Sequence, residues 1–400
     1  MSSRILNDWI SFYLKYTENT EPPESYHHWT ALSLIAGTLQ RKVYLRWGHG
    51  TIYPNLYIVL IGPSGRTRKG TAMDLGIDIF KETGLPITAE SITREALIKA
   101  LSEAINSYND PDTKEIEFHC SLTTFSKELS VFLGERDIRF LADLTDWYDS
   151  ADRWKYETKN SGKFLIRGIC YNLLGATAPD WLQTMIPMEA IGGGFTSRII
   201  FIVEEKKAKT VIFPVMTPEE KELKIALIKD LQKIANLGGE IRFDPKAKEM
   251  YANWYEIEDK KMDRGEFVIP DPRFSGYCER RPTHIRKLSM ILSASRGDDR
   301  TITELDFSRA QTLLENAEKK MAKVFGGVGR SNTGTMVFTI LEYIKEHKKV
   351  SKTHLVKTFY RDMTTSDLDE IEKVLFHMKV IIRVYNEDKK EYEYTYVGGE

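Results

Sequence analysis

The stretch NLYIVLIGPSGRTRKGTAMD at residues 55–74 decides the fold that we predict for this chain. It begins with an apolar, β-type run, LYIVLI, which leads directly into the glycine-containing segment GPSGRTRKGT. Apolar residues then recur at helical spacing through AMDLGIDIFKETG. The order strand, loop, helix is that of the first unit of a parallel α/β sheet, so we expect an α/β core built around this stretch.

The loop within this stretch contains the residue types of a phosphate-binding site. Such a site needs free backbone N–H groups, a lysine that reaches the phosphates and a hydroxyl for Mg²⁺, all at a helix N-terminus. We therefore expect ATP and Mg²⁺ to bind here, with Thr71 as the candidate metal ligand. The predicted nucleotide contacts are Gly62, Ser64, Gly65, Lys69, Gly70 and Thr71.

The spacing of this loop departs from the usual Walker A motif. One extra residue separates Gly65 from Lys69, and Gly70 separates that lysine from the hydroxyl residue. Arg68 stands where a glycine normally precedes the lysine. For the loop alone, the alternative interpretation is a glycine- and serine-rich surface turn between a strand and a helix.

Three downstream positions follow the order of a P-loop ATPase. Glu128 comes after the buried run EFHCSLTTF, where a carboxylate that activates water is expected, although Lys127 replaces the usual Walker B aspartate. Thr177 ends the run GICYNLLGAT, where its side chain would sense the γ-phosphate. Arg198 precedes the run IIFIV and is a candidate arginine finger. The alternatives are a solvated first-turn residue for Glu128 and an ordinary ion pair for Arg198.

A β-hairpin is expected between the second and third strands. The segment RWKYETKNSGKFLIRG, residues 153–168, alternates aromatic and apolar residues on both sides of the turn signal KNSGK. This pattern places Lys159 and Lys163 at or near the hairpin tip.

The remaining sequence predicts four segments. Within residues 1–50, helical spacing runs from Ile5 to about Trp47 and includes HHWTALSLIAGTLQRKVYL, so we expect a helical segment that covers an edge of the sheet. Residues 51–214 form the ATPase core, with four strands and a helix over TREALIKALSEAINSY. Strands stop at residue 215, where a helical lid domain runs to 326. Residues 331–400, three short helices and a hairpin, predict a winged-helix domain.

Composition limits the functions that this chain can have. Lys and Arg number 57 and Asp and Glu 58, so overall charge gives no signature of nucleic-acid binding, and any such surface is a local patch. The three cysteines are far apart and suit neither a disulfide framework nor a zinc site. No run approaches the roughly 20 apolar residues of a membrane span, so we expect a cytoplasmic protein without a membrane partner.

The order of these parts resembles a known family. It is similar to the P-loop ATPases of phages, plasmids and mobile elements that are related to the helicase half of primase-helicases, and to the AAA+ clade of the minichromosome-maintenance proteins. The similarity covers about Pro54 to Lys287. The segments that carry it are GPSG and RKGT, SKELSVFL, DLTDWYDSADRWKYETKNSGK, NLLGATAPDWL, GGGFTSRIIFI and RRPTHIRKLSMIL.

The resemblance implies an ATP-driven DNA helicase or translocase for replication of a mobile element. It implies an AAA+-like homo-oligomeric ring, most often a hexamer, in which the hairpin lysines contact single-stranded DNA. It also implies a second sensor arginine at Arg280 or Arg281, of which we assign Arg281 to the nucleotide. No primase-type segment is visible, so priming is expected to belong to a separate protein, a primase or an initiator.

Two other functions stay open from the sequence. One is an ATP-dependent DNA-binding initiator or helicase loader without unwinding activity, which would read duplex DNA through the winged helix. The third helix of that domain, TTSDLDEIEKVLFHMK, is strongly acidic and disfavours this role. The other is a P-loop-derived structural protein that no longer hydrolyses ATP, as the irregular loop and Lys127 allow.

Overall fold

The structure is a computed structural model that describes residues 4–89, 91–134, 137–158, 162–179, 194–322, 332–360, 363–387 and 391–397. Two compact units divide the chain, Met1–Val324 and Phe325–Glu400. The predicted segments 1–50 and 51–214, and the predicted lid up to residue 324, all lie within the first unit. None of the described helices is both long and apolar enough to cross a bilayer.

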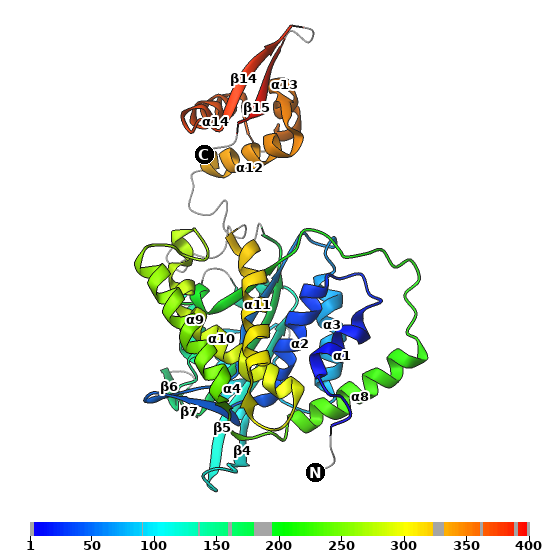
Figure 1. Ribbon diagram of the computed structural model, residues 1–400, viewed down its shortest axis with the longest axis vertical. Coiled ribbons are helices and arrows are strands. Elements are labelled where there is room, and N and C mark those ends of the chain that lie inside the picture. Colours follow the sequence, from blue (N-terminus) through cyan, green and yellow to red (C-terminus); the bar gives the residue numbers. More distant parts are fainter. Residues whose placement is uncertain are drawn as a thin grey trace. The chain divides into compact units, whose positions relative to one another are not determined.

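A five-stranded, largely parallel sheet forms the centre of the first unit (Figure 1). Its strand order is β4-β5-β8-β3-β9, and the four strands other than β4 run parallel. These four match the predicted strands. β3, β8 and β9 are buried throughout and β5 is buried from His119 to Ser126, as expected of a parallel sheet covered on both faces. The strands are β3 (Tyr57–Ile61), β4 (Ile105–Asn109), β5 (Ile116–Ser126), β8 (Ile169–Thr177) and β9 (Ile199–Val203).

The edge strand β4 corrects one prediction. The sequence predicted a helix over residues 93–108, but α4 ends at Glu103 and the next residues pair antiparallel with β5. Ala104 leaves the helical conformation, with ψ of 37°, and Ile105 pairs with Cys120. Pairing with a neighbouring strand outweighs the helical periodicity of the segment, as strand propensity depends on context.

The N-terminal segment covers a face of the sheet rather than the predicted edge. Helix α2 (Glu24–Leu39) is almost wholly buried and packs on β3, β5, β8 and β9. The predicted helix to Trp47 is wrong beyond residue 39, because Gln40 adopts a positive φ of 55° and ends it. The following strand β1 (Val43–Trp47) pairs with β2 (Gly50–Ile52). Figure 1 shows α1 (Trp9–Thr17), α2 and α3 (Lys69–Lys81) side by side.

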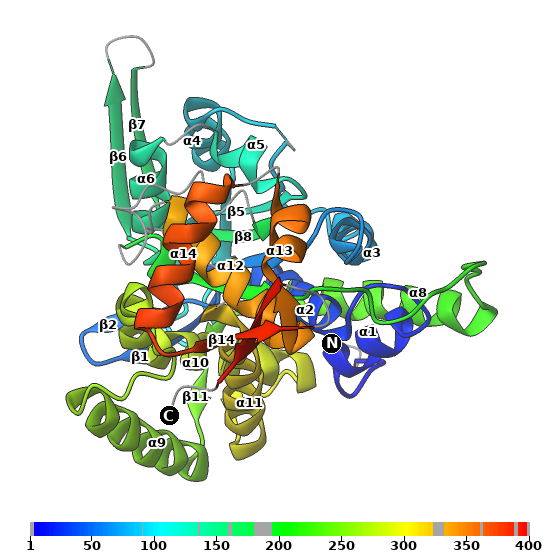
Figure 2. The same cartoon turned by 90° about the horizontal axis from the view of Figure 1, so that it is seen from above.

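The other elements of the core follow β5. Helices α5 (Leu129–Leu133) and α6 (Ile138–Tyr148) contact β8, and α4 (Arg94–Glu103) contacts β5 and β7. The predicted hairpin is confirmed as strands β6 (Arg153–Thr158) and β7 (Gly162–Arg167), which pair antiparallel. Figure 2 shows this ribbon projecting from the rest of the unit.

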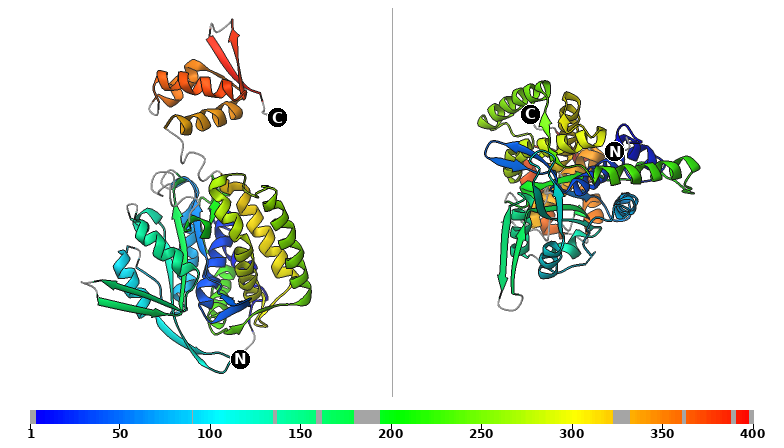
Figure 3. Two further views of the ribbon diagram at one scale, coloured as in Figure 1. Left: turned by 90° about the vertical axis from the view of Figure 1, so that its left-hand side faces the viewer. Right: turned by 90° about the horizontal axis from the view of Figure 1, so that it is seen from below.

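Helices dominate the chain from residue 218 to 321, as predicted. The left view of Figure 3 shows α9, α10 and α11 (green to yellow) packed side by side. Three two-residue strands also occur here, although none was expected, and one of them, β10, extends the β1–β2 ribbon. The elements are α8 (Pro218–Ile234), β10 (Gly239–Glu240), β11 (Arg242–Phe243), α9 (Pro245–Asp263), η3 (Pro272–Phe274), α10 (Ser275–Arg296), β12 (Thr301–Ile302) and α11 (Glu304–Met321).

The described residues of the second unit form three helices and a three-stranded sheet of order β13-β15-β14. The terminal hairpin is confirmed, and a short strand between the first two helices adds to it. Apolar side chains from all three helices, including Ile344, Leu355 and Ile371, form its core with Tyr394. The elements are α12 (Asn332–His347), β13 (Lys349–Ser351), α13 (Lys352–Phe359), α14 (Thr365–His377), β14 (Ile381–Asn386) and β15 (Glu391–Tyr396).

A buried lysine joins α10 to the start of β3. The Lys287 ammonium donates to the backbone carbonyl of Asn55 at 3.0 Å and to its side-chain oxygen at 2.7 Å, and lies 4.0 Å from the centre of the Tyr148 ring. Burial lowers the pKa of Lys287 to about 7. At pH values between this pKa and the higher pKa of the lysine in the unfolded chain, the folded chain binds fewer protons than the unfolded chain.

We therefore expect the free energy of unfolding to rise between pH 7 and about 10 through Lys287, because the charged form is the one that burial penalises. Replacing Lys287 by Met removes this contribution, so the variant should show a smaller rise than the wild type. Urea unfolding across this pH range measures the difference. Lys229→Met, on the exposed side of α8, is the matched control and should keep the wild-type slope. Equal slopes for the wild type and Lys287→Met would contradict the assignment.

Candidate functional site

The predicted phosphate loop lies at the carboxyl end of the parallel sheet. It leaves the end of β3 and enters α3 directly, and ligands of open α/β sheets bind at this edge. The amide of Gly62 donates to the backbone carbonyl of Thr177 at 3.3 Å, and Ile61 pairs with Thr177 across β3 and β8. The two predicted residues, one in the loop and one at the end of the sensor strand, are thus neighbours.

The first glycine of the loop is enclosed by three other groups. A Cβ atom on Gly62 would lie 2.5 Å from the Glu204 carbonyl oxygen, 2.6 Å from the Tyr26 hydroxyl and 2.7 Å from Thr67 Oγ1. Tyr26 also donates to the carbonyl of Ile61 at 2.6 Å. Helix α2, the strand that ends at Val203 and the loop itself therefore meet where β3 ends, and no side chain fits at that point.

The loop turns into α3 through two residues with left-handed backbone. Gly65 has φ of 68° and Arg68, directly before the helix, has φ of 59°. Arg68 therefore adopts a backbone conformation that glycine normally takes, at the position where the usual motif has a glycine. Nε of Arg68 donates to Glu21 at 2.8 Å, so its guanidinium is held by the N-terminal segment.

The N-terminus of α3 has the character of an anion site. Within the described chain, no side chain caps this helix, and its first residues are Lys69, Gly70 and Thr71. Backbone N–H groups in the first turn lack intrahelical partners and carry a partial positive charge. Ser64, Gly65 and Thr71 are exposed, so a ligand can reach them.

The predicted site residues Lys69 and Glu128 lie close enough to influence each other electrostatically. The Lys69 ammonium donates to the carbonyl of Gly62, and its pKa is lowered by burial while the Glu128 carboxylate opposes that shift. Glu128 is exposed at the start of α5. Beside it, Lys127 pairs with Asp74 of α3 at 2.7 Å, which holds the end of β5 against the helix that follows the loop.

The residues around Thr71 fit a Mg²⁺ ion that is bound mainly through nucleotide phosphates. The hydroxyl of Thr71 is exposed in the first turn of α3, and Glu128 is the nearby carboxylate that no described salt bridge engages. No cluster of three or more His, Cys, Asp or Glu side chains in the described residues forms a metal cage. Mg²⁺ in nucleotide sites uses one or two protein ligands, so this donor set is sufficient.

Arg198 is buried and does not face solvent. It lies in the short helix η2 (Thr196–Arg198) before β9, donates to the carbonyl of Gly194 at 2.6 Å and pairs with Asp149. Arg280 of α10 lies 3.5 Å from the same carboxylate, which is half-exposed. Burial lowers the pKa of Arg280, and the nearby Arg198 lowers it further. One carboxylate thus serves two arginines.

The position of Arg281 corrects a prediction. Instead of facing the loop, its guanidinium pairs with Glu258 and donates to both oxygens of Glu318, at 2.7 Å and 3.0 Å. Both glutamates lie in neighbouring helices, so this side chain holds α9, α10 and α11 together. The two adjacent arginines point to different surroundings, and Arg280 is the one beside Arg198.

The hairpin lysines are only partly described. Lys163 lies in β7, exposed to solvent and 3.8 Å from Glu157 of the facing strand. Lys159 lies outside the described residues.

Several residues of the site had no signal in the sequence. Tyr26 and Glu21 precede the loop by about 40 residues, and no role was predicted for Asp74 or Asp149, although both lie in quoted segments. Each is recognisable only from its contact with a loop residue or with a predicted site residue. No protein-family model matches the chain, and no curated protein matches it at a significant level.

Gly62→Ala should destabilise the protein by roughly 1–3 kcal/mol, because the added methyl group overlaps a backbone oxygen and two hydroxyls. Gly70→Ala is the matched control, since a Cβ there meets nothing within 4 Å and alanine favours a helix by up to about 1 kcal/mol. Urea midpoints of both variants measure this contrast. A Gly62→Ala variant as stable as the wild type would contradict the close packing.

Proposed function

We propose that the chain is an ATP-driven DNA helicase or translocase that acts as a ring. The observation that carries the proposal is the convergence of Lys69, Glu128 and Thr177 at the loop that follows β3. An acidic side chain near the phosphate-binding lysine is what hydrolysis of a phosphoanhydride requires, and Glu128 follows β5, which β8 separates from β3 in the sheet. A surface turn has no need for such a set of residues.

In the proposed reaction, Lys69 exchanges the carbonyl of Gly62 for phosphate oxygens, and the first-turn N–H groups of α3 bind the phosphates. Glu128 accepts a proton from a water molecule, whose oxygen bonds to the γ-phosphorus while the bond to the β–γ bridging oxygen breaks. ADP and phosphate leave. Bound Mg²⁺, held by Thr71, would neutralise charge on the phosphates. Thr177, adjacent to Gly62, orients the γ-phosphate or the water.

The pair Arg198 and Arg280 supports action across a subunit boundary. The two guanidinium groups share the half-exposed Asp149, which leaves one positive charge unbalanced in that group of three. A phosphate presented by a neighbouring subunit would compensate this charge through Arg280, which is 32% exposed, because Arg198 is buried. In this role Arg280, rather than Arg281, is the partner of the finger. The projecting β6–β7 ribbon with Lys163 would then contact the strand.

The second candidate is an initiator or loader that binds DNA without unwinding it. The order of elements in the second unit, α12, β13, α13, α14 and the hairpin β14–β15, favours a winged helix, which many DNA-binding proteins use. Helix α14, the candidate recognition helix, contains Asp367, Asp369, Glu370 and Glu372. Lys352 pairs with two of these carboxylates, so this face suits a protein contact better than DNA.

We expect Lys69→Ala to lower ATP hydrolysis by about 100-fold or more, because it removes the main cation from the phosphate site. Glu128→Gln should abolish turnover but retain ATP binding, since it removes only the base. Steady-state phosphate release and isothermal titration with ATP and Mg²⁺ measure the two effects. Lys81→Ala, at the far end of the same helix, is the control and should behave as wild type.

Unwinding of a forked DNA duplex separates the two functions. The helicase proposal predicts ATP-dependent strand displacement that is lost in Lys69→Ala. ATP-dependent DNA binding without displacement would instead identify an initiator or loader. No binding of ATP by the wild type would reject both and identify a structural protein.

A further inference from the structure

A pocket, which we call the hollow, lies at the opposite end of the sheet from the phosphate loop. It has a volume of about 480 Å³ and lies where β5 begins and where Gly168 precedes β8. The ribbon β1–β2 and the edge strand β4 close its other sides. Its volume is in the range of sites that hold a small molecule or a nucleotide. None of the predicted site residues contributes to it.

The walls of the hollow are aromatic and held in place by hydrogen bonds. Tyr44, Tyr53 and Tyr108 line it, and the Arg41 guanidinium lies 4.1 Å from the centre of the Tyr53 ring. The Tyr108 hydroxyl lies 3.4 Å from the buried carboxylate of Asp110. Arg41 is itself fixed by the carbonyls of Ser150 and Ile169 and by Asp152. The rings therefore form a preorganised surface on which a planar group can stack.

One polar atom in this wall has no partner. His119 is 1% exposed, its Nδ1 lies 2.8 Å from the Ser121 hydroxyl, and among the described residues its Nε2 has no hydrogen-bond partner. Burial lowers the pKa of His119 to about 4, so the imidazole is neutral at physiological pH. A buried nitrogen without a partner costs about 1–3 kcal/mol. This nitrogen is closed to solvent, so a ligand in the hollow would remove the cost only after the surrounding side chains shift.

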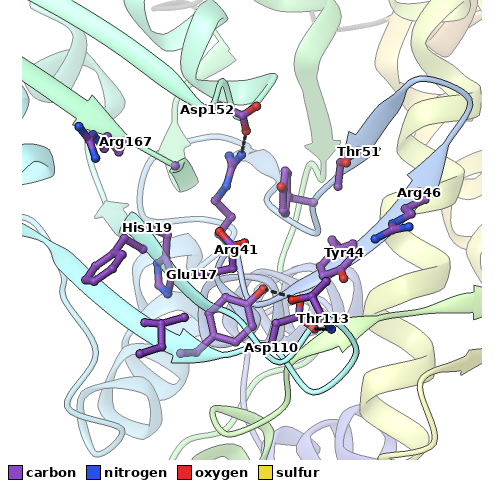
Figure 4. A pocket seen from close by; sticks show the side chains of 15 residues that line it. Arg41, Tyr44, Arg46, Thr51, Asp110, Thr113, Glu117, His119, Asp152 and Arg167 are labelled. Atoms are coloured by element: carbon purple, nitrogen blue, oxygen red, sulfur yellow. Dashed lines mark hydrogen bonds and ion pairs between the residues drawn. The ribbon is translucent and has the colours of Figure 1, made fainter.

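Two exposed arginines lie on opposite sides of the hollow. Figure 4 shows Arg46, from β1, on one side and Arg167, from β7, on the other, with Arg41 between them. Of the three carboxylates that line the site, Asp110 accepts hydrogen bonds from backbone and tyrosine, and Asp152 pairs with Arg41. Glu117 is the third and is exposed. The lining therefore holds three arginines and three carboxylates, with Arg46 and Arg167 as exposed cations on opposite sides of the hollow.

We propose that this hollow receives one base of a single nucleic-acid strand, with the flanking phosphates on Arg46 and Arg167. The assignment to a strand rests on the proposed function. Arg46 and Arg167, on opposite sides of the hollow, fit the two phosphates that flank one nucleotide of a strand. A free nucleotide carries its phosphates on one side only. Exposed Phe118, 60% accessible beside the hollow, offers a further stacking surface.

The test is binding of a short fluorescein-labelled oligothymidylate to the full chain, measured by anisotropy without ATP. The double variant Arg46→Gln/Arg167→Gln should bind at least about tenfold more weakly, and its log–log salt slope should be smaller by about 1.4, roughly 0.7 for each phosphate of a single strand. The control Lys246→Gln/Arg264→Gln removes the same charge from exposed positions on α9 and its end, and should bind as wild type.

A second readout tests the base itself. Oligothymidylate with one 5-iodouracil should cross-link on irradiation to the peptides that contain Tyr53, Tyr108 or Phe118. If the mononucleotide 5-iodo-deoxyuridine monophosphate cross-links to these peptides while the oligonucleotide does not bind, the hollow is a site for a free nucleotide. Wild-type affinity in Arg46→Gln/Arg167→Gln, or cross-links only to other peptides, would overturn the site.

Failure of this site is distinguishable from failure of the proposed function. If Arg46→Gln/Arg167→Gln binds the oligonucleotide as the wild type does, and ATP hydrolysis still depends on Lys69, only the base site is rejected. Intact binding in a chain that neither binds nor hydrolyses ATP rejects the translocase and keeps the hollow as a strand-binding site.

Discussion

The close approach of several chain segments at Gly62 is the constraint on which the candidate site depends. Its amide reaches the carbonyl of Thr177, and a hydroxyl from α2 and a carbonyl beyond β9 lie where a side chain would otherwise begin. The ends of strands β3, β8 and β9 and helix α2 therefore meet at one point. Because protein interiors are close-packed and deform little, the loop that leaves this point has a defined start, and Lys69 and the first turn of α3 take their positions from it.

The cations of the site are each held by a nearby acceptor. Lys69 lies on the carbonyl of Gly62, Arg68 on Glu21 and Arg198 on Asp149. Glu21 also binds Lys207, and the pKa of its carboxyl is lowered to about 2, chiefly by that lysine. Phosphates would compete with these acceptors, since charge-assisted bonds to phosphate are stronger than bonds to a carbonyl. In such a site a bound phosphate would displace the Lys69 contact to the carbonyl of Gly62, whereas the bonds of Arg68 and Arg198 to carboxylates are themselves charge-assisted.

The sequence predicted the parts of the fold whose signals are local. The run LYIVLI, the end of β8 at Thr177 and the ribbon around KNSGK follow from apolar periodicity and turn residues, and the structure has each of them. Features that depend on distant partners were missed. Residues 105–109 form a strand because β5 lies alongside, and α2 covers a face because the sheet needs both faces buried. Arg280 and Arg281 are adjacent in sequence, and only packing distinguishes the one beside Arg198 from the one between Glu258 and Glu318.

The central claim is that the loop after β3 holds the phosphates of ATP. Hydrogen–deuterium exchange with and without a non-hydrolysable ATP analogue and Mg²⁺ tests it most directly, because the first-turn amides of α3 would become hydrogen-bonded. We predict slower exchange in peptides that cover Gly62 to Thr71, and smaller changes around Glu128 and Thr177. Saturating nucleotide that protects other segments but leaves Gly62 to Thr71 unchanged would contradict the account.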